Sequence, residues 1–257
     1  VFSQELSAPS VVAAVNGWVS DHTNGMIPRI LSEPFNENAA LLLVNALYLK
    51  NTWETEFDPN NTYLRGFYHQ GSDKESMDFL NAGFVTFPYL QSETAQGAVL
   101  PYDDGRLAFF ALMPEEGAEF EVWLNSLDGD TFTQILESRT DTEFLTLALP
   151  KFEAEWDGQL QDILSALGLD LAFTFGEADF SLMGDNPNGY YLSQVIHAAK
   201  IEVNEQGTEA AAATVVEAVG GSAAPPETGL TLIFDHPFLY GIVDLETGVP
   251  LFLGTFE

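Results

Sequence analysis

The sequence contains no cysteine, which excludes a disulfide framework, a thiol nucleophile and a cysteine-based zinc site. This absence fits a bacterial or archaeal protein and argues against the disulfide-stapled secreted class. There is also no run of 18 apolar residues, so no transmembrane helix is predicted. The first residues, VFSQELSAPS, lack an initiating Met and show no signal peptide, so we expect this sequence to be a piece of a longer one.

Basic residues are scarce. Eight Lys and Arg stand against 39 Asp and Glu, which gives a net charge of −31. Such a surface repels phosphate backbones and anionic lipid, so neither nucleic acid nor a membrane is expected as a partner. We interpret the charge as a solvated, soluble coat, with adaptation to high salt as the alternative.

Catalytic motifs are absent as well. The sequence has no GxSxG elbow, no HExxH helix and no Gly-rich phosphate loop. The four histidines (His22, His69, His197 and His236) are far apart and none pairs with another at ligand spacing. We therefore predict no catalytic residue, no metal site and no cofactor, and the protein is not expected to be an enzyme.

What is present is the composition of a globular domain, with 257 residues, 46% hydrophobic and 12% aromatic. An amphipathic helix is predicted over 10–31 with a break at 23–25, and a strand buried on both faces over 39–50. The other predicted strands are 84–89, 97–101, 107–113, 142–156, 190–206, 230–245 and 248–256, and the other predicted helices are 120–127, 131–138 and 158–168. This order predicts one α+β domain with mainly antiparallel sheets.

Two features remain after the regular elements are assigned. The segment NEQGTEAAAATVVEAVGGSAAPPETG (204–229) separates two strands and has almost no core-forming side chains. Loops longer than ~12–15 residues are uncommon and are usually functional or disordered. A flexible linker or a short Ala-rich helix would also account for it. In addition, Asn45 and His197 interrupt apolar strands, and buried polar groups need polar partners.

The sequence resembles the serpin family over essentially its whole length. Leu49 and Asn51 depart from the family pattern. Six stretches carry the resemblance in family order: VNGWVSDHTNGMI (15–27), LVNALYLKNTW (43–53), LALPKFE (147–153), LGLDLAF with ADFS (167–181), VIHAAKIEVNEQGTEAAAAT (195–214) and DHPFLYGIVDLETGVPLFLG (235–254).

The resemblance implies the serpin fold, a mainly antiparallel multi-sheet structure with surrounding helices and an exposed reactive-centre loop at about 205–229. It places 1–257 as a single partial domain, the C-terminal two-thirds of a serpin. Apolar faces would then lack their covering helix, so the isolated piece is expected to aggregate and to inhibit poorly.

The resemblance also implies a suicide-substrate mechanism. A target serine protease attacks the loop and is trapped as an acyl-enzyme while the cleaved loop inserts as an extra strand. Small side chains at the hinge suit that insertion, because bulky or charged ones would clash or lie buried unpaired. The implied hinge residues are Glu205, Gly207, Thr208, Glu209, Ala210, Ala211, Ala212, Ala213 and Thr214.

Family spacing places the cleaved bond between Gly221 and Ser222, with Ala218, Val219 and Ala223 as alternatives. All are small and the loop has no Arg or Lys, so an elastase-like or subtilisin-like target is expected. A non-inhibitory binding or carrier serpin, an inactive truncated fragment and an α+β enzyme with an unrecognised site are the alternatives.

Further roles carry over by motif. Asn45 and His197 resemble the polar shutter pair beneath the parting strands. Trp53, Lys151 and Glu205 resemble the breach where insertion starts, and a Lys151–Glu205 ion pair is predicted there. We expect the full-length protein to be a monomer located outside the cell or in the periplasm, with the cytoplasm left open.

Overall fold

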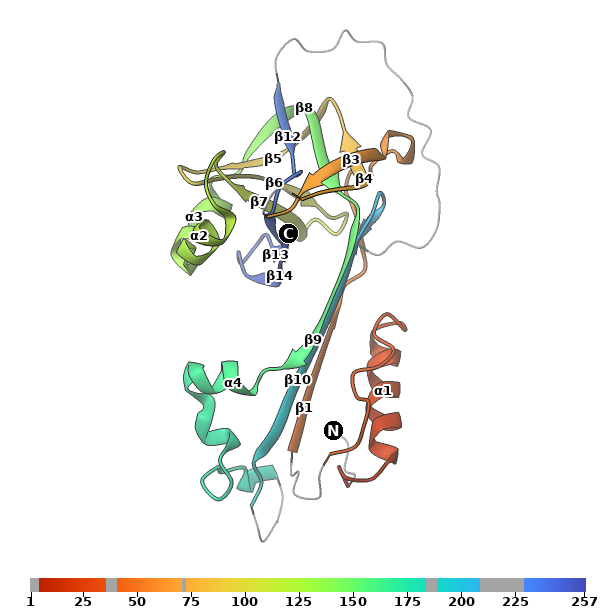
Figure 1. The fold of residues 1–257 in the computed structure, drawn as a ribbon, viewed down its shortest axis with the longest axis vertical. Coiled ribbons are helices and arrows are strands. Elements are labelled where there is room, and N and C mark those ends of the chain that lie inside the picture. The colour runs from red at the N-terminus through yellow and green to blue at the C-terminus, as the bar shows by residue number, and fades with distance from the viewer. Residues whose placement is uncertain (1–4, 36–40, 71–72, 184–188, 209–228) are drawn as a thin grey trace. The chain divides into compact units, whose positions relative to one another are not determined.

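The structure, a computed structural model, describes residues 5–35, 41–70, 73–183, 189–208 and 229–257. They belong to two units, each formed by two stretches of the chain (Figure 1). The first unit combines Val1–Leu49 with Glu153–Ile201, and the second combines Lys50–Phe152 with Glu202–Glu257. No helix within the described ranges is long and apolar enough to cross a membrane.

The first unit consists of one long helix, three long strands and several short helical turns. Its elements are α1 (Ser10–His22), β1 (Leu41–Tyr48), β9 (Phe152–Gln159), α4 (Gln161–Leu164), η2 (Ser165–Leu169), η3 (Asp170–Phe173), η4 (Ser181–Met183) and β10 (Leu192–Val203). β10 pairs in parallel with β1 and also pairs with β9.

The apolar stripe of α1 covers one face of β1 and β10. Val11, Val15 and Val19 recur at the four-residue spacing that places side chains on one side of a helix. They are buried in one cluster with Ile196 and Ala198 of β10. Burial of each valine contributes roughly 1.5–3 kcal/mol, so this stripe attaches the helix to the sheet.

The second unit is mainly antiparallel β-structure. Its elements are β2 (Asn51–Thr52), η1 (Pro59–Asn61), β3 (Tyr63–Tyr68), β4 (Lys74–Ala82), β5 (Val85–Gln91), β6 (Ala95–Pro101), β7 (Leu107–Pro114), α2 (Phe120–Ser126), α3 (Gly129–Glu137), β8 (Thr140–Pro150), β11 (Gly207–Thr208), β12 (Leu230–Ile233), β13 (Phe238–Asp244) and β14 (Pro250–Phe256). The large sheet has the strand order β14-β13-β7-β6-β5-β8-β4-β3, and β12 pairs with β8.

Helices α2 and α3 pack against one face of this sheet. Phe120 and Trp123 of α2 and Ile135 and Leu136 of α3 are buried in a cluster with Phe110 of β7. Figure 1 shows the two helices side by side next to β6 and β7. Their apolar side chains therefore close the core of the second unit on that face.

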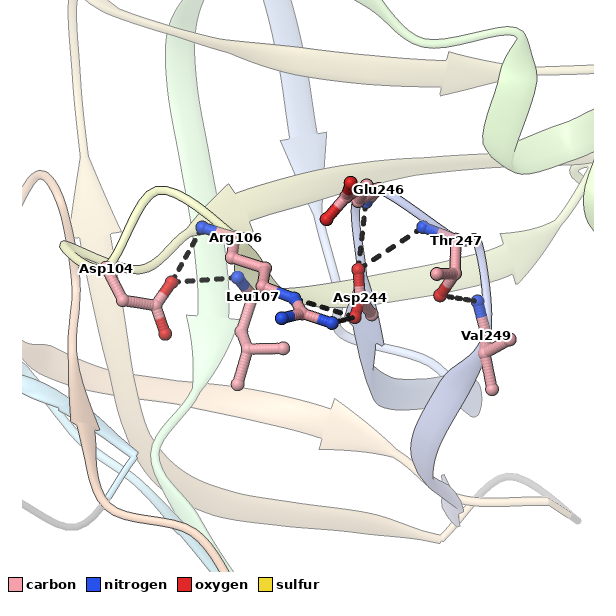
Figure 2. A network of polar contacts seen from close by, with 7 residues as sticks. All are labelled: Asp104, Arg106, Leu107, Asp244, Glu246, Thr247 and Val249. Atoms are coloured by element: carbon pink, nitrogen blue, oxygen red, sulfur yellow. Dashed lines mark hydrogen bonds and ion pairs between the residues drawn. The ribbon is translucent and has the colours of Figure 1, made fainter.

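A polar network ties two turns of the second unit together (Figure 2). Asp244 accepts hydrogen bonds from Arg106 Nε (2.9 Å) and Nη2 (2.6 Å), and from the backbone N–H groups of Glu246 (2.9 Å) and Thr247 (3.2 Å). The hydrogen bond from Arg106 is the main cause that lowers the pKa of Asp244. Asp104 in turn accepts from the N–H of Arg106 at 2.8 Å. The turn before β7 and the turn after β13 are thus held by one carboxylate.

Three predicted elements differ from the structure. The strand predicted over 142–156 is two strands, β8 and β9, separated at Lys151, because the chain leaves its pairing with β4 there and pairs next with β10. The strand predicted over 230–245 is also two, β12 and β13, with Pro237 between them, since proline cannot donate to a ladder. The helix predicted over 158–168 is only a short α4 followed by a π-turn.

Three further expectations need correction. The break expected at 23–25 is confirmed, since α1 ends at His22 and Asn24 and Gly25 have positive φ angles of 49° and 82°, but the expected continuation of the helix over 26–31 is wrong. The strand over 39–50 is covered on one face only, because Leu43 on the opposite face is 51% exposed. The hairpin of β3 and β4 was not predicted, since exposed charged residues break its apolar pattern.

Candidate functional site

The first residues of the small-residue segment form a short strand, β11. It pairs antiparallel with β2 through Gly207 with Thr52 and Thr208 with Asn51. On its other side Thr208 pairs with Val203 at the end of β10. A strand with partners on both sides has its backbone N–H and C=O groups satisfied. The implied hinge therefore begins as a docked strand.

Only glycine fits at position 207. A Cβ built there would lie 2.1 Å from Asn51 O and 2.8 Å from the Cα of Thr52, closer than real Cβ atoms approach. The φ of +155° is also a conformation that other residues rarely adopt. The missing side chain thus allows β11 to lie against β2.

Thr208 is anchored by an aromatic pair. Its side chain is 1% exposed, and its hydroxyl shares a short hydrogen bond with the hydroxyl of Tyr102. Burial raises the pKa of Tyr102, so this hydroxyl stays protonated and can donate. The Tyr102 ring stacks on the indole of Trp53 with centroids 4.9 Å apart, and Trp53 Nε1 donates to Asn204 O at 2.9 Å. The first turn and strand of the segment are thus fixed through Trp53 and Tyr102.

The predicted Lys151–Glu205 ion pair is present. Lys151 Nζ lies 2.9 Å from Glu205 Oε2 and 3.2 Å from Oε1. Thr62 Oγ1 donates to Oε1 at 2.8 Å, and the N–H of Phe57 donates to the backbone carbonyl of Glu205 at 2.8 Å. Burial alone would raise the pKa of Glu205, but the hydrogen bond from Lys151, with smaller contributions from the backbone and Thr62, lowers it below its ordinary value. Glu205 is therefore an ionised acceptor at neutral pH.

Asn45 and His197 are brought together as the resemblance implies. They are register partners on β1 and β10, and Asn45 Nδ2 lies 3.0 Å from His197 Nδ1. With the amide as donor, the ring nitrogen accepts, and burial lowers the pKa of His197 in agreement with a neutral ring. The expectation that both are buried is wrong, because Asn45 is exposed and His197 only half-buried, on the face opposite α1. Trp156 packs beside His197 with ring centroids 5.7 Å apart.

The far end of the segment is anchored separately. Leu230 and Leu232 of β12 pair in parallel with Phe144 and Leu147 of β8, and Leu232 is 1% exposed. Figure 1 shows β12 beside β8. Both ends of the segment are therefore held by strand pairing in the second unit.

The remaining implied loop residues lie outside the described residues. They are Glu209, Ala210, Ala211, Ala212, Ala213, Thr214, Ala218, Val219, Gly221, Ser222 and Ala223.

The site was only partly predicted from sequence. Trp53, Lys151 and Glu205 were singled out by motif, whereas Tyr102 and Thr62 were missed. The only signal at Tyr102 is an aromatic residue with a polar tip at the end of an apolar strand, in LPYDDG. Within the described ranges, no three His, Asp or Glu side chains are grouped so that they could hold a metal ion. The feature that the structure shows at this site is that the small-residue segment begins as a paired strand, β11.

Comparison with known proteins gives one consistent result. A family model described as Serpin (serine protease inhibitor) matches residues 1–257. Intracellular coagulation inhibitor 2 of Tachypleus tridentatus is 33% identical over 243 residues, which are 94% of this chain and 58% of that protein. An uncharacterised serpin-like protein of Thermococcus kodakarensis is 34% identical over 253 residues, 93% of this chain and 54% of that protein.

A solved structure gives the same result for the fold. The thermophilic serpin tengpin in its native state is 30% identical and superposes with a TM-score of 0.86, covering 97% of this chain and 63% of that one. The chain thus spans about three fifths of the length of the relatives that it matches.

Proposed function

The chain belongs to the serpin family, and from this premise we propose that the whole protein is a suicide-substrate inhibitor of serine proteases. The target protease attacks the segment at about 205–229 and forms an acyl-enzyme. The cleaved loop then inserts as an additional strand, and the protease is trapped before it can hydrolyse the ester. The partner is a serine protease, and the inhibitor acts as a monomer.

The docked strand β11 is the observation that supports this mechanism. Its position between β2 and the end of β10 is where an inserting strand would begin. The residues that follow are Glu209 and then four alanines and a threonine, and a close-packed sheet can accept the small side chains of the latter five. At ~1 kcal/mol net per backbone hydrogen bond, insertion of about fifteen residues releases on the order of 10–20 kcal/mol, enough to drive an irreversible rearrangement.

The specificity follows from the loop sequence. From Gly207 to Ala224 its residues are small, aliphatic or acidic, and none is Arg or Lys. We therefore assign an elastase-like or subtilisin-like target, with cleavage between Gly221 and Ser222, or else at Ala218, Val219 or Ala223.

The remaining roles complete the proposal. Residues 205 and 207–214 act as the hinge, Asn45 and His197 as the shutter, and Trp53, Lys151 and Glu205 as the breach. A protein that meets such proteases acts outside the cell or in the periplasm of a bacterium or archaeon.

The test uses the full-length protein with pancreatic elastase and with subtilisin, followed by denaturing gels and mass spectrometry. We expect a band at the summed mass that survives denaturant, and a released peptide that identifies the cleaved bond. A protease with its catalytic serine changed to alanine is the control and should give no such band. Clean cleavage with no stable complex would refute trapping and support the binding or carrier alternative.

A further inference from the structure

Phe84 combines backbone strain with exposure in a way that the inhibitory mechanism leaves unexplained. Its φ is 57°, in the left-handed region that bulky residues rarely adopt. Its side chain is 57% exposed, although phenylalanine is among the residues most often buried. Both features have an energetic cost, and strained residues of this kind cluster at binding sites.

The strain has a definite structural effect. Ala82 of β4 pairs with Leu147 of β8, and Val85 of β5 pairs with Phe144, three residues further along each strand. β4 and β5 therefore pair with β8 in the same register. They would form one continuous strand if the backbone did not turn at Phe84. That turn interrupts the ladder, and the phenyl ring is left in solvent.

The position of Phe84 is next to the anchored end of the loop. By the shared register Phe84 lies opposite Leu145 of β8. Leu145 lies over Gly229, the residue that joins the loop to β12, because a Cβ at Gly229 would be 2.8 Å from Leu145 Cγ. Neighbouring strands are ~4.8 Å apart, so Phe84 stands about two strand spacings, or ~10 Å, from the base of the loop. A protease that docks at the base of the loop through an interface of standard size, ~800 Å² per partner or roughly 30 Å across, would extend over that distance.

We propose that Phe84 is a second contact for the protease that binds the loop, an aromatic anchor outside the cleavage sequence. Exposed aromatic residues that become buried are the side chains that dominate binding energy at interfaces. Thr86 and Glu143, an exposed cross-strand pair beside Phe84, add a negative charge. The complementary surface on the protease is therefore an apolar depression with a basic edge. This inference rests on the proposed function and adds a source of target selectivity to it.

The test measures the second-order rate constant at which subtilisin and elastase consume the loop of the full-length protein, whether the product is a trapped complex or a cleaved chain. Phe84→Ala removes the anchor and should slow consumption about thirtyfold with at least one of the two proteases, the loss expected for an interface hot spot. Phe84→Asn removes the ring but tolerates the left-handed backbone, so it should slow consumption equally while its Tm does not fall. Val122→Ala on α2, where the side chain is 65% exposed, is the matched control and should leave the rate unchanged.

A second measurement uses the absence of cysteine. In Phe84→Cys the new thiol is the only one in the described chain, so its alkylation rate reports the exposure of this position directly. We expect fast alkylation in the free protein and protection on binding a protease whose catalytic serine is changed to alanine.

The outcomes separate the two proposals. If both proteases consume the loop of the Phe84 variants at the unsubstituted rate, the inference about Phe84 is wrong and the inhibitory function stands. Slow alkylation in the free full-length protein would also overturn it, because position 84 would then be covered by another part of the chain. If neither protease consumes the unsubstituted loop, the proposed function fails and the inference fails with it.

Discussion

On the proposed function, replacing Thr208 with arginine should convert the full-length protein from an inhibitor into a substrate. Thr208 is 1% exposed and bonded to the buried hydroxyl of Tyr102, so an arginine there would bury an unpaired charge at a cost of several kcal/mol. Docking of β11 depends on the pairing of Thr208 with Val203 and Asn51 and on the Tyr102 bond. At ~1 kcal/mol each, these bonds amount to about 3–4 kcal/mol. Undocking β11 is therefore cheaper than burying the charge, and the rest of the fold should persist.

The assay compares stoichiometries in the full-length protein. Titration of subtilisin with the unsubstituted inhibitor should reach complete inhibition near one molecule per protease. Thr208→Arg should instead be cleaved at the same bond with no stable complex. Its Tm should fall by no more than the loss of the β11 hydrogen bonds, about 3–4 kcal/mol, accounts for. Thr208→Ser keeps the hydroxyl and should inhibit normally.

A double-mutant cycle checks the assumed anchor. Thr208→Val leaves the Tyr102 hydroxyl buried without a partner and should lower the free energy of unfolding by ~1–3 kcal/mol. Tyr102→Phe leaves the Thr208 hydroxyl without its partner and should lower the free energy of unfolding by a similar amount. The double variant should cost clearly less than the sum, because neither group is then left unpaired. Full inhibition by Thr208→Arg, or additivity in this cycle, would refute the reasoning that docking of β11 depends on this buried contact.

Three other predictions concern stability. Gly207→Ala places a methyl group 2.1 Å from Asn51 O and should cost roughly 1–3 kcal/mol in a denaturant titration, with an unchanged midpoint contradicting the close approach. The pKa of Glu205 is lowered in the folded state, so its contribution is present above the ordinary carboxyl value of about 4.3 and is lost as pH falls through the lowered one. The stability gap between the unsubstituted protein and Glu205→Gln should accordingly close as pH falls from the ordinary carboxyl value through the lowered pKa of Glu205. The gap should stay near or below ~1 kcal/mol because Lys151 is 41% exposed. A net charge of −31 should make Tm rise as potassium chloride increases from 0.1 M towards 1 M, where the screening length shortens from about 10 Å to about 3 Å, and a flat curve would refute self-repulsion.

Strands with a core-facing side could be located from the sequence, whereas exposed strands and the division of a long strand could not. Alternation and apolar runs located β6, β7 and β14 to within two residues, because their side chains face a core on at least one side. The hairpin of β3 and β4 escaped prediction since Leu64 and Tyr63 are exposed and charged residues interrupt the pattern. The division at Lys151 could not be seen either, because it comes from a change of partner strand, from β4 to β10, and both partners are distant in sequence.

The site shows the same limit. Motif resemblance identified Glu205 and Lys151, and opposite charges at those positions made an ion pair a reasonable expectation. Nothing in the sequence near Thr208 indicates that its partner is Tyr102, which lies 106 residues earlier. The strained Phe84 was also invisible, since a left-handed backbone is expected at Gly or Asn and not at an aromatic residue.

The pairing of β13 has a practical consequence for anyone who handles the protein. β13 lies between β7 and β14, and all seven of its residues are buried. A cut anywhere in the loop leaves the C-terminal fragment woven into the sheet by β12, β13 and β14, with no covalent link to the remainder. Nicked and intact molecules should therefore co-elute on a sizing column, and the two fragments of a nicked molecule should separate only in denaturant. A preparation that gives a single native peak can thus already consist of cleaved protein.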